Sequence, residues 1–272
     1  MELTESDVKV SSGNGVSKPG IVGETNRAIP AVTVEDMREV DRMAIEEFGV
    51  ELAQMMENAG RHLASLARKV LRTAEGKNIS VLVGKGNNGG GGLVAARHLS
   101  NWGGEVAVIL SRGPAELGTT TGRQLETVRE MGLHILRPSD RGFLGRARKL
   151  MEQCDLVLDA IIGYGLTGSP RGTAASLIRT ANEASTPVLA LDVPSGLDAT
   201  SGEVGRPCIR ASWTLTLALP KTGLLKAGVE RVVGELFLAD IGIPRQVYEK
   251  LGIEGVFRGG DLVRIREGTG KP

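Results

Sequence analysis

The sequence predicts an α/β fold: a Rossmann-like, doubly wound, mostly parallel sheet with helices on both faces, in three α/β/α layers. Two observations carry this prediction. Short apolar runs alternate with amphipathic helical patterns, and a glycine-rich segment joins one of the runs to the next helix. Strands that are buried on both faces read as continuous apolar runs, so this alternation is typical of a parallel sheet covered by helices. The runs are 79–83, 106–110, 156–158 and 188–191, and the helical patterns lie near 92–102, 119–131 and 171–184.

The N-terminal segment has a different composition from the rest of the chain. Residues 1–29 contain much Ser, Gly and Thr and show little periodicity. We therefore expect a flexible N-terminal tail over 1–29 and a single Rossmann-like domain over 30–272. At the start of the domain, Thr33 and Asp36 have the spacing of a helix capping box, and apolar residues then recur at helical intervals. A second helix is expected over 52–71, where the same interval repeats.

The last quarter of the chain has another pattern again. The runs 213–219 and 232–239 resemble strands, and the segment between them is too short for a long helix. We therefore expect these two strands to pair at an edge of the sheet.

Composition limits the classes of ligand and the location. The chain of 272 residues has 33 Lys and Arg residues against 32 Asp and Glu residues, which gives a formal charge of +1. Such a balance gives no general attraction to nucleic acid or to an anionic membrane, so an anionic ligand must be held by local groups. The two cysteines form no CxxC pair, and the N-terminal segment lacks the apolar core of a secretory signal. We expect a cytoplasmic protein that binds neither nucleic acid nor membrane.

The glycine-rich segment 84–92 is the first candidate ligand site. It holds six glycines and the pair Asn87 and Asn88, directly after an apolar run and before an expected helix. Glycines let the backbone approach a phosphate closely, and the free amides of a helix start donate hydrogen bonds to it. The segment therefore predicts part of a nucleotide site. A turn that serves only strand-to-helix packing is the alternative.

Two known phosphate loops differ from this segment. It lacks the GK[ST] ending of a P-loop, because Lys85 precedes the asparagines and no Ser or Thr follows. Gly84, Gly86 and Gly89 match the GxGxxG spacing of dinucleotide-binding folds, but the next strand is followed by Arg112 and not by the acidic residue that would confirm it. Because an arginine there suits a 2′-phosphate, an NADP-dependent oxidoreductase is an alternative function.

Further motifs follow the apolar runs, where ligands gather in open parallel sheets, and one lies on the second expected helix. They are DAIIGYGLTGS at 159–169, LDVPSGLD at 191–198, LALPKTGL at 217–224, LADIGIP at 238–244 and MMENAG at 55–60. In this order the set resembles the YjeF N-terminal family, the NAD(P)H-hydrate epimerases, over residues 31–245.

The resemblance implies an isomerase that interconverts the R and S epimers of NADHX and NADPHX, the hydrated forms of NADH and NADPH. The reacting carbon, C6, is a hemiaminal centre: the lone pair of the ring nitrogen expels hydroxide, and water returns to either face. Stabilising the resulting cation and moving the protons are tasks suited to a carboxylate. Asp192, at the expected end of a strand, is the preferred catalytic candidate. A turn-capping aspartate before Pro194 is the alternative for this residue.

The resemblance also implies which residues contact the substrate and a potassium ion. The implied potassium ligands have oxygen atoms that suit a hard cation, and an ordinary network of loop hydrogen bonds is their alternative role. They are Asn88, Asp159 and Ser195. The implied substrate contacts are Asn87, Asn88, Gly89, Gly90, Gly91, Gly163, Tyr164, Gly165, Leu166, Thr167, Gly168, Ser169 and Asp192. A flexible connection to the next helix is the alternative for 163–169, and Lys221 is either a phosphate contact or an exposed lysine at a strand end.

One position departs from the family pattern. The family loop reads GNNGGDG, whereas residues 86–92 read GNNGGGG, so Gly91 stands at the aspartate position. A catalytically weakened nucleotide-binding or scaffold protein of the same fold is therefore an alternative to the epimerase. The family further implies a homodimer and functional coupling to a separate NAD(P)HX dehydratase. The choice between NADHX and NADPHX stays open.

Overall fold

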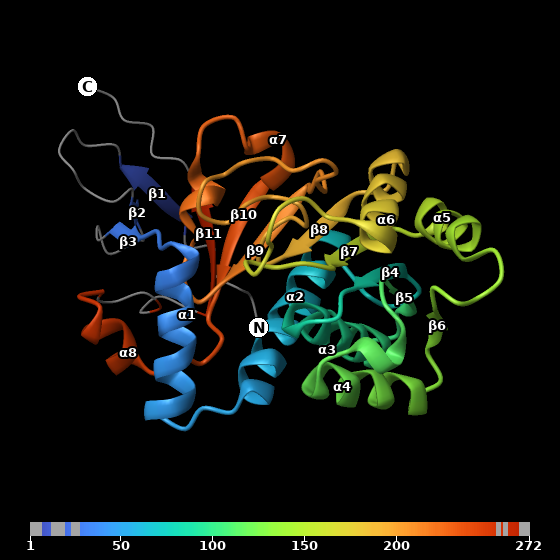
Figure 1. Cartoon of the computed structure of the whole chain (residues 1–272), viewed down its shortest axis with the longest axis horizontal. Helices are drawn as coiled ribbons and strands as arrows, with labels where there is room; N and C mark the ends of the chain where they lie inside the picture. The colour runs from blue at the N-terminus through green and yellow to red at the C-terminus, as the bar shows by residue number, and fades with distance from the viewer. Residues whose placement is uncertain (1–6, 12–19, 23–27, 254–256, 258–260, 267–272) are drawn as a thin grey trace.

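The computed structural model describes residues 7–11, 20–22, 28–253, 257 and 261–266, and these form one sheet of eleven strands (Figure 1). The strands are β1 (Asp7–Ser11), β2 (Gly20–Val22), β3 (Ala28–Pro30), β4 (Asn78–Val83), β5 (Glu105–Leu110), β6 (His134–Leu136), β7 (Leu156–Ala160), β8 (Val188–Leu191), β9 (Trp213–Leu217), β10 (Glu235–Ala239) and β11 (Leu262–Arg266). Their order across the sheet is β3-β2-β1-β11-β10-β9-β8-β7-β4-β5-β6. All neighbours from β10 to β6 run parallel, whereas β10–β11, β1–β2 and β2–β3 are antiparallel.

The helices that cover this sheet fill most of the intervals between the parallel strands. They are α1 (Val34–Arg42), the π-helix η1 (Met43–Glu47), α2 (Leu52–Leu71), α3 (Asn87–Asn101), the 3₁₀ turn η2 (Pro114–Glu116), α4 (Thr119–Glu130), α5 (Phe143–Gln153), α6 (Gly172–Glu183), the 3₁₀ turn η3 (Thr222–Leu225), α7 (Glu230–Val233) and α8 (Arg245–Lys250). The prediction of a Rossmann-like, mostly parallel α/β fold is confirmed. The capping box of α1 forms as expected, with Thr33 and Asp36 bonding each other's backbone amides.

Side chains of the central strand β4 point alternately into two cores, as strand geometry requires. Val81 and Val83 belong to a core that α2, α3 and α4 complete, and Leu82 belongs to a second core that α5 and α6 complete. Figure 1 shows these two groups of helices on opposite sides of the strands. A third core joins α1 and α8 to β10 and β11, and its members include Val40 and Leu238. The sheet is therefore covered on both faces.

Helix α3 begins earlier than the sequence pattern predicts, because the glycine run belongs to the helix. Gly89, Gly90 and Gly92 are buried and closely packed. A Cβ added at Gly92 would lie 2.6 Å from the Cβ of Ala160, and one added at Gly90 would lie 2.4 Å from the Sδ of Met56. These glycines therefore let α3 lie directly against β7 and α2, so strand-to-helix packing accounts for part of the motif.

Two parts of the chain differ from the expected arrangement. The segment 1–29, expected as a tail, contains β1, β2 and most of β3, and β1 pairs in parallel with β11. Strands this short give too few residues for a periodic signal to be recognised in the sequence. The strands β9 and β10 do pair, but the prediction of an edge position is wrong, because β8 and β11 flank them. The sequence pattern also missed β6 and α5.

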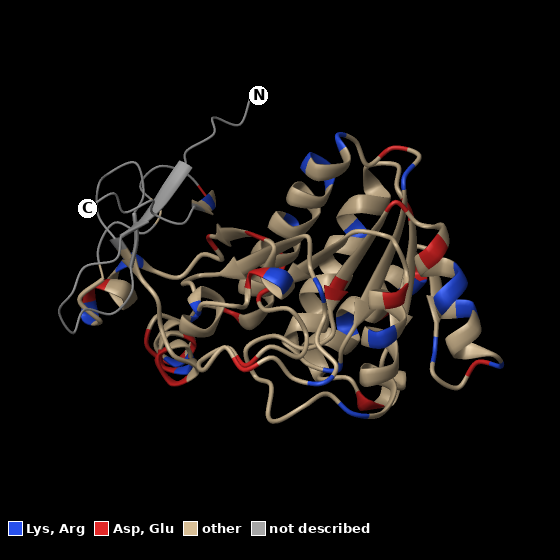
Figure 2. Ribbon diagram, turned by 90° about the horizontal axis from the view of Figure 1, so that it is seen from above, with Lys and Arg blue, Asp and Glu red and all other residues tan. Residues whose placement is uncertain are grey.

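Charged residues of both signs are spread over the described part of the chain. Figure 2 shows basic and acidic residues interspersed along the ribbon of the described helices and loops, in agreement with the formal charge of +1. Among the described residues, no helix combines the length and the apolar character needed to cross a membrane.

Candidate functional site

A cavity of about 570 Å³ lies at the carboxyl ends of the parallel strands, and α1 and α2 close it on another side. Its volume is in the range of small-molecule sites. It brings together segments that are far apart in the sequence, including the start of α3, the loop after β7 and the residues after β8 and β9. The lining residues are Met37, Arg38, Asp41, Leu52, Met55, Met56, Ala59, Lys85, Gly86, Asn87, Asn88, Gly91, Ile161, Ile162, Gly163, Tyr164, Gly165, Leu166, Thr167, Leu191, Asp192, Leu217, Lys221 and Ile241.

Asp192 lies in the wall of this cavity directly after β8. Its φ of 67° is in the left-handed region, which costs an L-residue of this kind about 1 kcal/mol or more. The strained backbone turns the carboxylate toward the cavity, where Oδ2 accepts a hydrogen bond of 2.8 Å from the backbone amide of Tyr164. The side chain is only 3% exposed, so the carboxylate is held in one place by the fold.

Lys221 follows β9, and its ammonium is the ion-pair partner of this carboxylate. Its Nζ donates to Oδ1 of Asp192 at 2.6 Å and to the carbonyl of Leu217 at 2.8 Å. Lys221 is 1% exposed. The alternative of an exposed lysine at a strand end is therefore wrong. The chain reverses through Ala218, at φ 62°, and the following bridge between Val32 and Lys221 directs the lysine inward.

A second carboxyl group faces the cavity from α1. The hydroxyl of Tyr164 donates to Oδ2 of Asp41 at 2.5 Å. Burial raises the pKa of Asp41, although the hydrogen bond from Tyr164 and the charge of Lys221 oppose this shift. Burial and the charge of Asp41 also raise the pKa of Tyr164 well above its usual range, so the phenol stays protonated and donates.

The sequence analysis did not identify Asp41, although a signal was present. In α1 the buried positions Met37 and Val40, together with Ala44 in η1, share one helix face. Asp41 lies four residues after Met37, on that same apolar face. A lone carboxyl group in such a position is a candidate for a functional residue.

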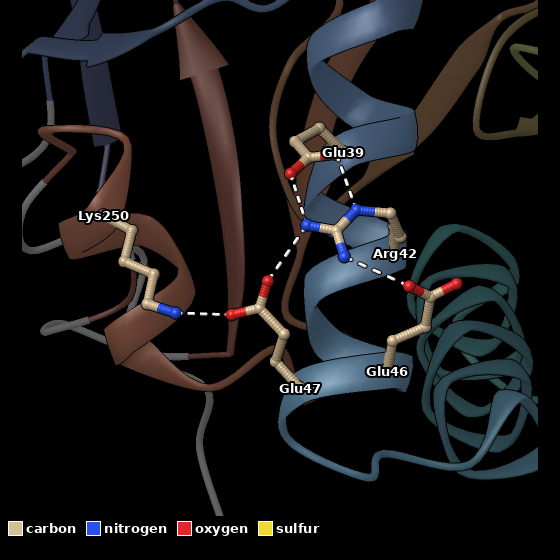
Figure 3. Close-up of polar contacts among 5 residues, drawn as sticks. All are labelled: Glu39, Arg42, Glu46, Glu47 and Lys250. Atoms are coloured by element: carbon tan, nitrogen blue, oxygen red, sulfur yellow. Dashed lines mark hydrogen bonds and ion pairs between the residues drawn. The ribbon is translucent and has the colours of Figure 1, made fainter.

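The opposite face of α1 carries an exposed network of ion pairs (Figure 3). Arg42 contacts Glu39 at 2.7 Å, Glu46 at 3.1 Å and Glu47 at 2.9 Å, and Glu47 also contacts Lys250 of α8 at 2.5 Å. Exposed pairs of this kind stabilise a protein weakly, but together they link the end of the helix to α8. The network leaves Arg38 and Asp41 on the cavity side of α1.

The implied potassium ligands lie next to the cavity. Asp159 is fully buried, and its oxygens accept hydrogen bonds from Ser195 Oγ at 2.7 Å, Ser195 N at 2.8 Å and Ile161 N at 3.2 Å. Burial raises the pKa of Asp159 to about 6, because these neutral donors compensate only part of the cost of a buried charge. Asn88 is held by a different hydrogen bond, in which its side-chain amide donates to the carbonyl of Leu191 at 3.3 Å.

These three residues offer only oxygen donors, which is the donor set that a hard cation prefers. The described residues contain no cluster of three or more His, Cys, Asp or Glu side chains that is suited to a metal. A carboxylate, a hydroxyl and an amide oxygen therefore fit an alkali cation better than a transition metal.

The structure separates the implied substrate contacts into two groups. Asn87, Asn88, Gly91 and Asp192 line the cavity, as do the first five residues of the loop 163–169. Gly89, Gly90, Gly168 and Ser169 are absent from the lining. The backbone amides in the first turn of α3 have no partner within the helix, so they remain donors for an anion at this edge of the cavity.

The Leu191 side chain lies where a side chain at position 91 would extend. A Cβ added at Gly91 would lie 2.8 Å from Cδ2 of Leu191. The leucine side chain therefore occupies part of the space that a larger residue at position 91 would need.

Arg112, on which the oxidoreductase alternative depends, is directed elsewhere. Its Nη1 lies 3.6 Å from Glu116, its side chain is about half exposed, and it is absent from the cavity lining. The geometry therefore gives no support to a 2′-phosphate contact at this residue.

Comparison with known proteins identifies relatives over most of the chain. The family described as YjeF-related protein N-terminus matches residues 52–223. The NAD(P)H-hydrate epimerase of Dehalogenimonas lykanthroporepellens is 45% identical over 244 residues, which cover 88% of this chain and 94% of that protein. The NAD(P)H-hydrate epimerase of Rhodopirellula baltica is 35% identical over 83% of this chain and 89% of its own length.

Two further comparisons concern a longer relative and a solved structure. The bifunctional NAD(P)H-hydrate repair enzyme Nnr of Moorella thermoacetica is 41% identical over 79% of this chain, but the match covers only 41% of that protein. The crystal structure of yeast ynu0, YNL200c, has the same fold, with a TM-score of 0.75 and 23% identity, over 87% of this chain and 100% of that chain. From the family match and the identity to these relatives, we conclude that the chain belongs to the YjeF-related protein N-terminus family.

Proposed function

We propose that this chain is an NAD(P)H-hydrate epimerase, an isomerase that interconverts the R and S epimers of hydrated NADH or NADPH. Two relatives that bear this name are 45% and 35% identical to the chain, and a longer repair enzyme contains a region similar to it. The observation that carries the proposal is the carboxylate of Asp192, which lies buried and ion-paired in the wall of the cavity at the strand ends.

The arrangement suits the chemistry of a hemiaminal. Loss of hydroxide from C6 leaves a positive charge that is shared between C6 and the ring nitrogen. A carboxylate held in a fixed position in the cavity wall stabilises such a charge. Lys221 donates a hydrogen bond of 2.6 Å to the Asp192 carboxylate and so holds it in place. The first turn of α3 offers amides to the anionic part of the dinucleotide at the other side of the cavity.

We further propose that Asn88, Asp159 and Ser195 hold a potassium ion. The ion would supply the positive charge that the buried carboxylate of Asp159 lacks, and it would tie the loops after β7 and β8 to the start of α3. The oxygen donors and the raised pKa of Asp159 support this proposal. In this proposal the ion would have a structural role, holding together the segments that carry these three residues.

A coupled assay tests the function. A mixture of NADPHX epimers is treated with an excess of a dehydratase that accepts one epimer, and this protein is then added. We expect the resistant fraction to be consumed faster, with no change in the redox state of added NADP⁺. Binding of the hydrated dinucleotide without acceleration would instead support a nucleotide-binding protein that has lost turnover, for which Gly91 at the family's aspartate position is the argument.

A separate dehydratase is the partner that such an activity needs, because epimerisation alone does not return the hydrated nucleotide to NADPH. The name of the bifunctional relatives is in keeping with this coupling. The cytoplasmic location and the homodimer stay predictions from the sequence.

A further inference from the structure

Asp41 and Asp192 occupy two different walls of the same cavity. Asp192 follows β8 in the sheet, whereas Asp41 lies on α1, which covers the cavity. Asp41 is part-buried and hydrogen-bonded, so its position is fixed by the fold. The cavity therefore presents two carboxyl groups, of which the sequence motifs identify only one.

Tyr164 connects the two carboxyl groups through its opposite ends. Its backbone amide donates to Asp192 at 2.8 Å, and its hydroxyl donates to Asp41 at 2.5 Å. The two groups are therefore separated by the length of one tyrosine. The ammonium of Lys221 lies 5.6 Å from the centre of the tyrosine ring and contacts only Asp192 of the two carboxyl groups.

From this geometry we infer that Asp41 is a second acid–base residue of the site, and that epimerisation uses Asp41 and Asp192 as a pair. The inference rests on the proposed function and assigns it a further catalytic residue. A reaction that removes hydroxide from one face of C6 and returns water to the other needs one proton donor and one proton acceptor. Two carboxyl groups on different walls meet this need, whereas one group would have to serve both faces.

The proton balance of the step is complete. Asp41 donates its proton to the C6 hydroxyl, the C6–O bond breaks with its electron pair leaving on water, and the ring-nitrogen lone pair forms the C=N⁺ bond. A water molecule then forms a new C6–O bond and gives its proton to Asp192. The opposite epimer reacts with the roles reversed, and exchange with solvent resets the two protonation states.

The two carboxyl groups have different polar neighbours. Around Asp41 lie the Tyr164 hydroxyl, the carboxylate of Asp192, the ammonium of Lys221 and, next to Tyr164, the guanidinium of Arg38. Burial is the largest influence and raises the pKa of Asp41, so this group keeps its proton to higher pH than an exposed aspartate. Asp192 has the ammonium of Lys221 in direct contact at 2.6 Å, whereas Asp41 accepts its hydrogen bond from Tyr164, so the two carboxyl groups differ in their contacts.

The test compares Asp41→Asn with Glu46→Gln, which removes a carboxylate from the neighbouring exposed turn. In the coupled assay we expect Asp41→Asn to lower kcat by about 100-fold or more, because general acid–base groups contribute at least this much, while KM changes little. Glu46→Gln should keep the wild-type rate. If Asp41→Asn keeps wild-type kcat while the wild type is active, the inference is overturned and the proposed function stands. If the wild-type protein is itself inactive, this result contradicts the proposed function, and the inference that rests on it falls as well.

The pH profile separates proton transfer from a structural role. For the epimer that receives its proton from Asp41, the wild-type kcat should fall as the pH rises through the pKa of Asp41, and the residual rate of Asp41→Asn should lack this fall. Tyr164→Phe removes a hydrogen bond that lowers the pKa of Asp41, so the fall should move to higher pH. An Asp41→Asn profile that keeps the same fall as the wild type would contradict acid–base chemistry at this residue.

Discussion

The ammonium of Lys221 lies 2.6 Å from a carboxylate oxygen of Asp192, and both side chains are almost completely buried. Buried charges are tolerated only in such pairs, because each isolated charge loses its hydration without compensation. The ion pair therefore fixes the position of the candidate catalytic carboxylate.

Lys221→Met should destabilise the protein because it leaves the Asp192 carboxylate buried and unpaired. We expect a loss of about 3–5 kcal/mol in the free energy of unfolding, measured by urea titration. Lys226→Met, at an exposed position in the same segment, is the matched control. The double variant Lys221→Met with Asp192→Asn should recover part of the loss, since no unpaired charge remains. If Lys221→Met has the same free energy of unfolding as the wild type, the ion pair contributes little to stability.

Gly163→Ala should impair activity through a direct contact with the site. An added Cβ would lie 2.8 Å from Oδ2 of Asp192 and 3.2 Å from Oδ1 of Asn88, so either the loop or the carboxylate must shift. We expect kcat/KM to fall by about 10-fold to 100-fold, as small displacements in a reacting geometry commonly do. Gly122→Ala in α4 meets nothing within 4 Å and serves as the control. Equal rates for the two variants would speak against the placement of Asp192.

Gly91→Asp tests whether the missing family aspartate limits the rate. On its own this variant brings its Cβ against Cδ2 of Leu191 at 2.8 Å, and overpacking of this kind typically costs about 1–3 kcal/mol. Leu191→Val removes the opposing methyl group, so the double variant should regain stability. A double-mutant cycle in urea measures this coupling. If the carboxylate matters for turnover, the double variant epimerises faster than Leu191→Val alone, and equal rates would show that the loop needs no aspartate.

Potassium should stabilise the protein in a pH-dependent way. Burial raises the pKa of Asp159 from 3.8 to about 6, so without a cation this group contributes stability below pH 3.8 that is lost as the pH rises through about 6. A cation needs the ionised form and therefore stabilises most above pH 6. We expect KCl to raise Tm at pH 8 relative to tetramethylammonium chloride of equal ionic strength, with a smaller effect at pH 5. The same rise at both pH values, or in Asp159→Asn, would contradict the proposed ion site.

The sequence predicted the parallel core well and the sheet ends poorly. Strand β8 and helix α2 have the predicted bounds, because long apolar runs and helical periodicity report burial directly. The short strands β1, β2 and β6 have too few residues for such a signal, and their pairing depends on neighbours that come from distant parts of the chain. The same holds for β11, which places β9 and β10 inside the sheet.

The candidate site was likewise predicted only in part. Motifs at strand ends located Asp192, Asn88 and the loop 163–169 at one edge, because parallel strands all end there. The contacts that these side chains make in the folded protein could not be predicted from the sequence. The burial of Lys221 depends on how the chain turns after β9, and the approach of Asp41 depends on the packing of α1 over the cavity.

The conversion of one purified epimer tests the central claim most directly. Isolated R-NADPHX is incubated with the protein, and the appearance of the S epimer is followed by chromatography beside a sample without protein and one with Asp192→Asn. We predict that the wild-type protein brings the two epimers to equilibrium faster than the protein-free sample, and that Asp192→Asn is slower by about 100-fold or more. A wild-type rate equal to that of the protein-free sample would contradict the assignment of this chain as an epimerase.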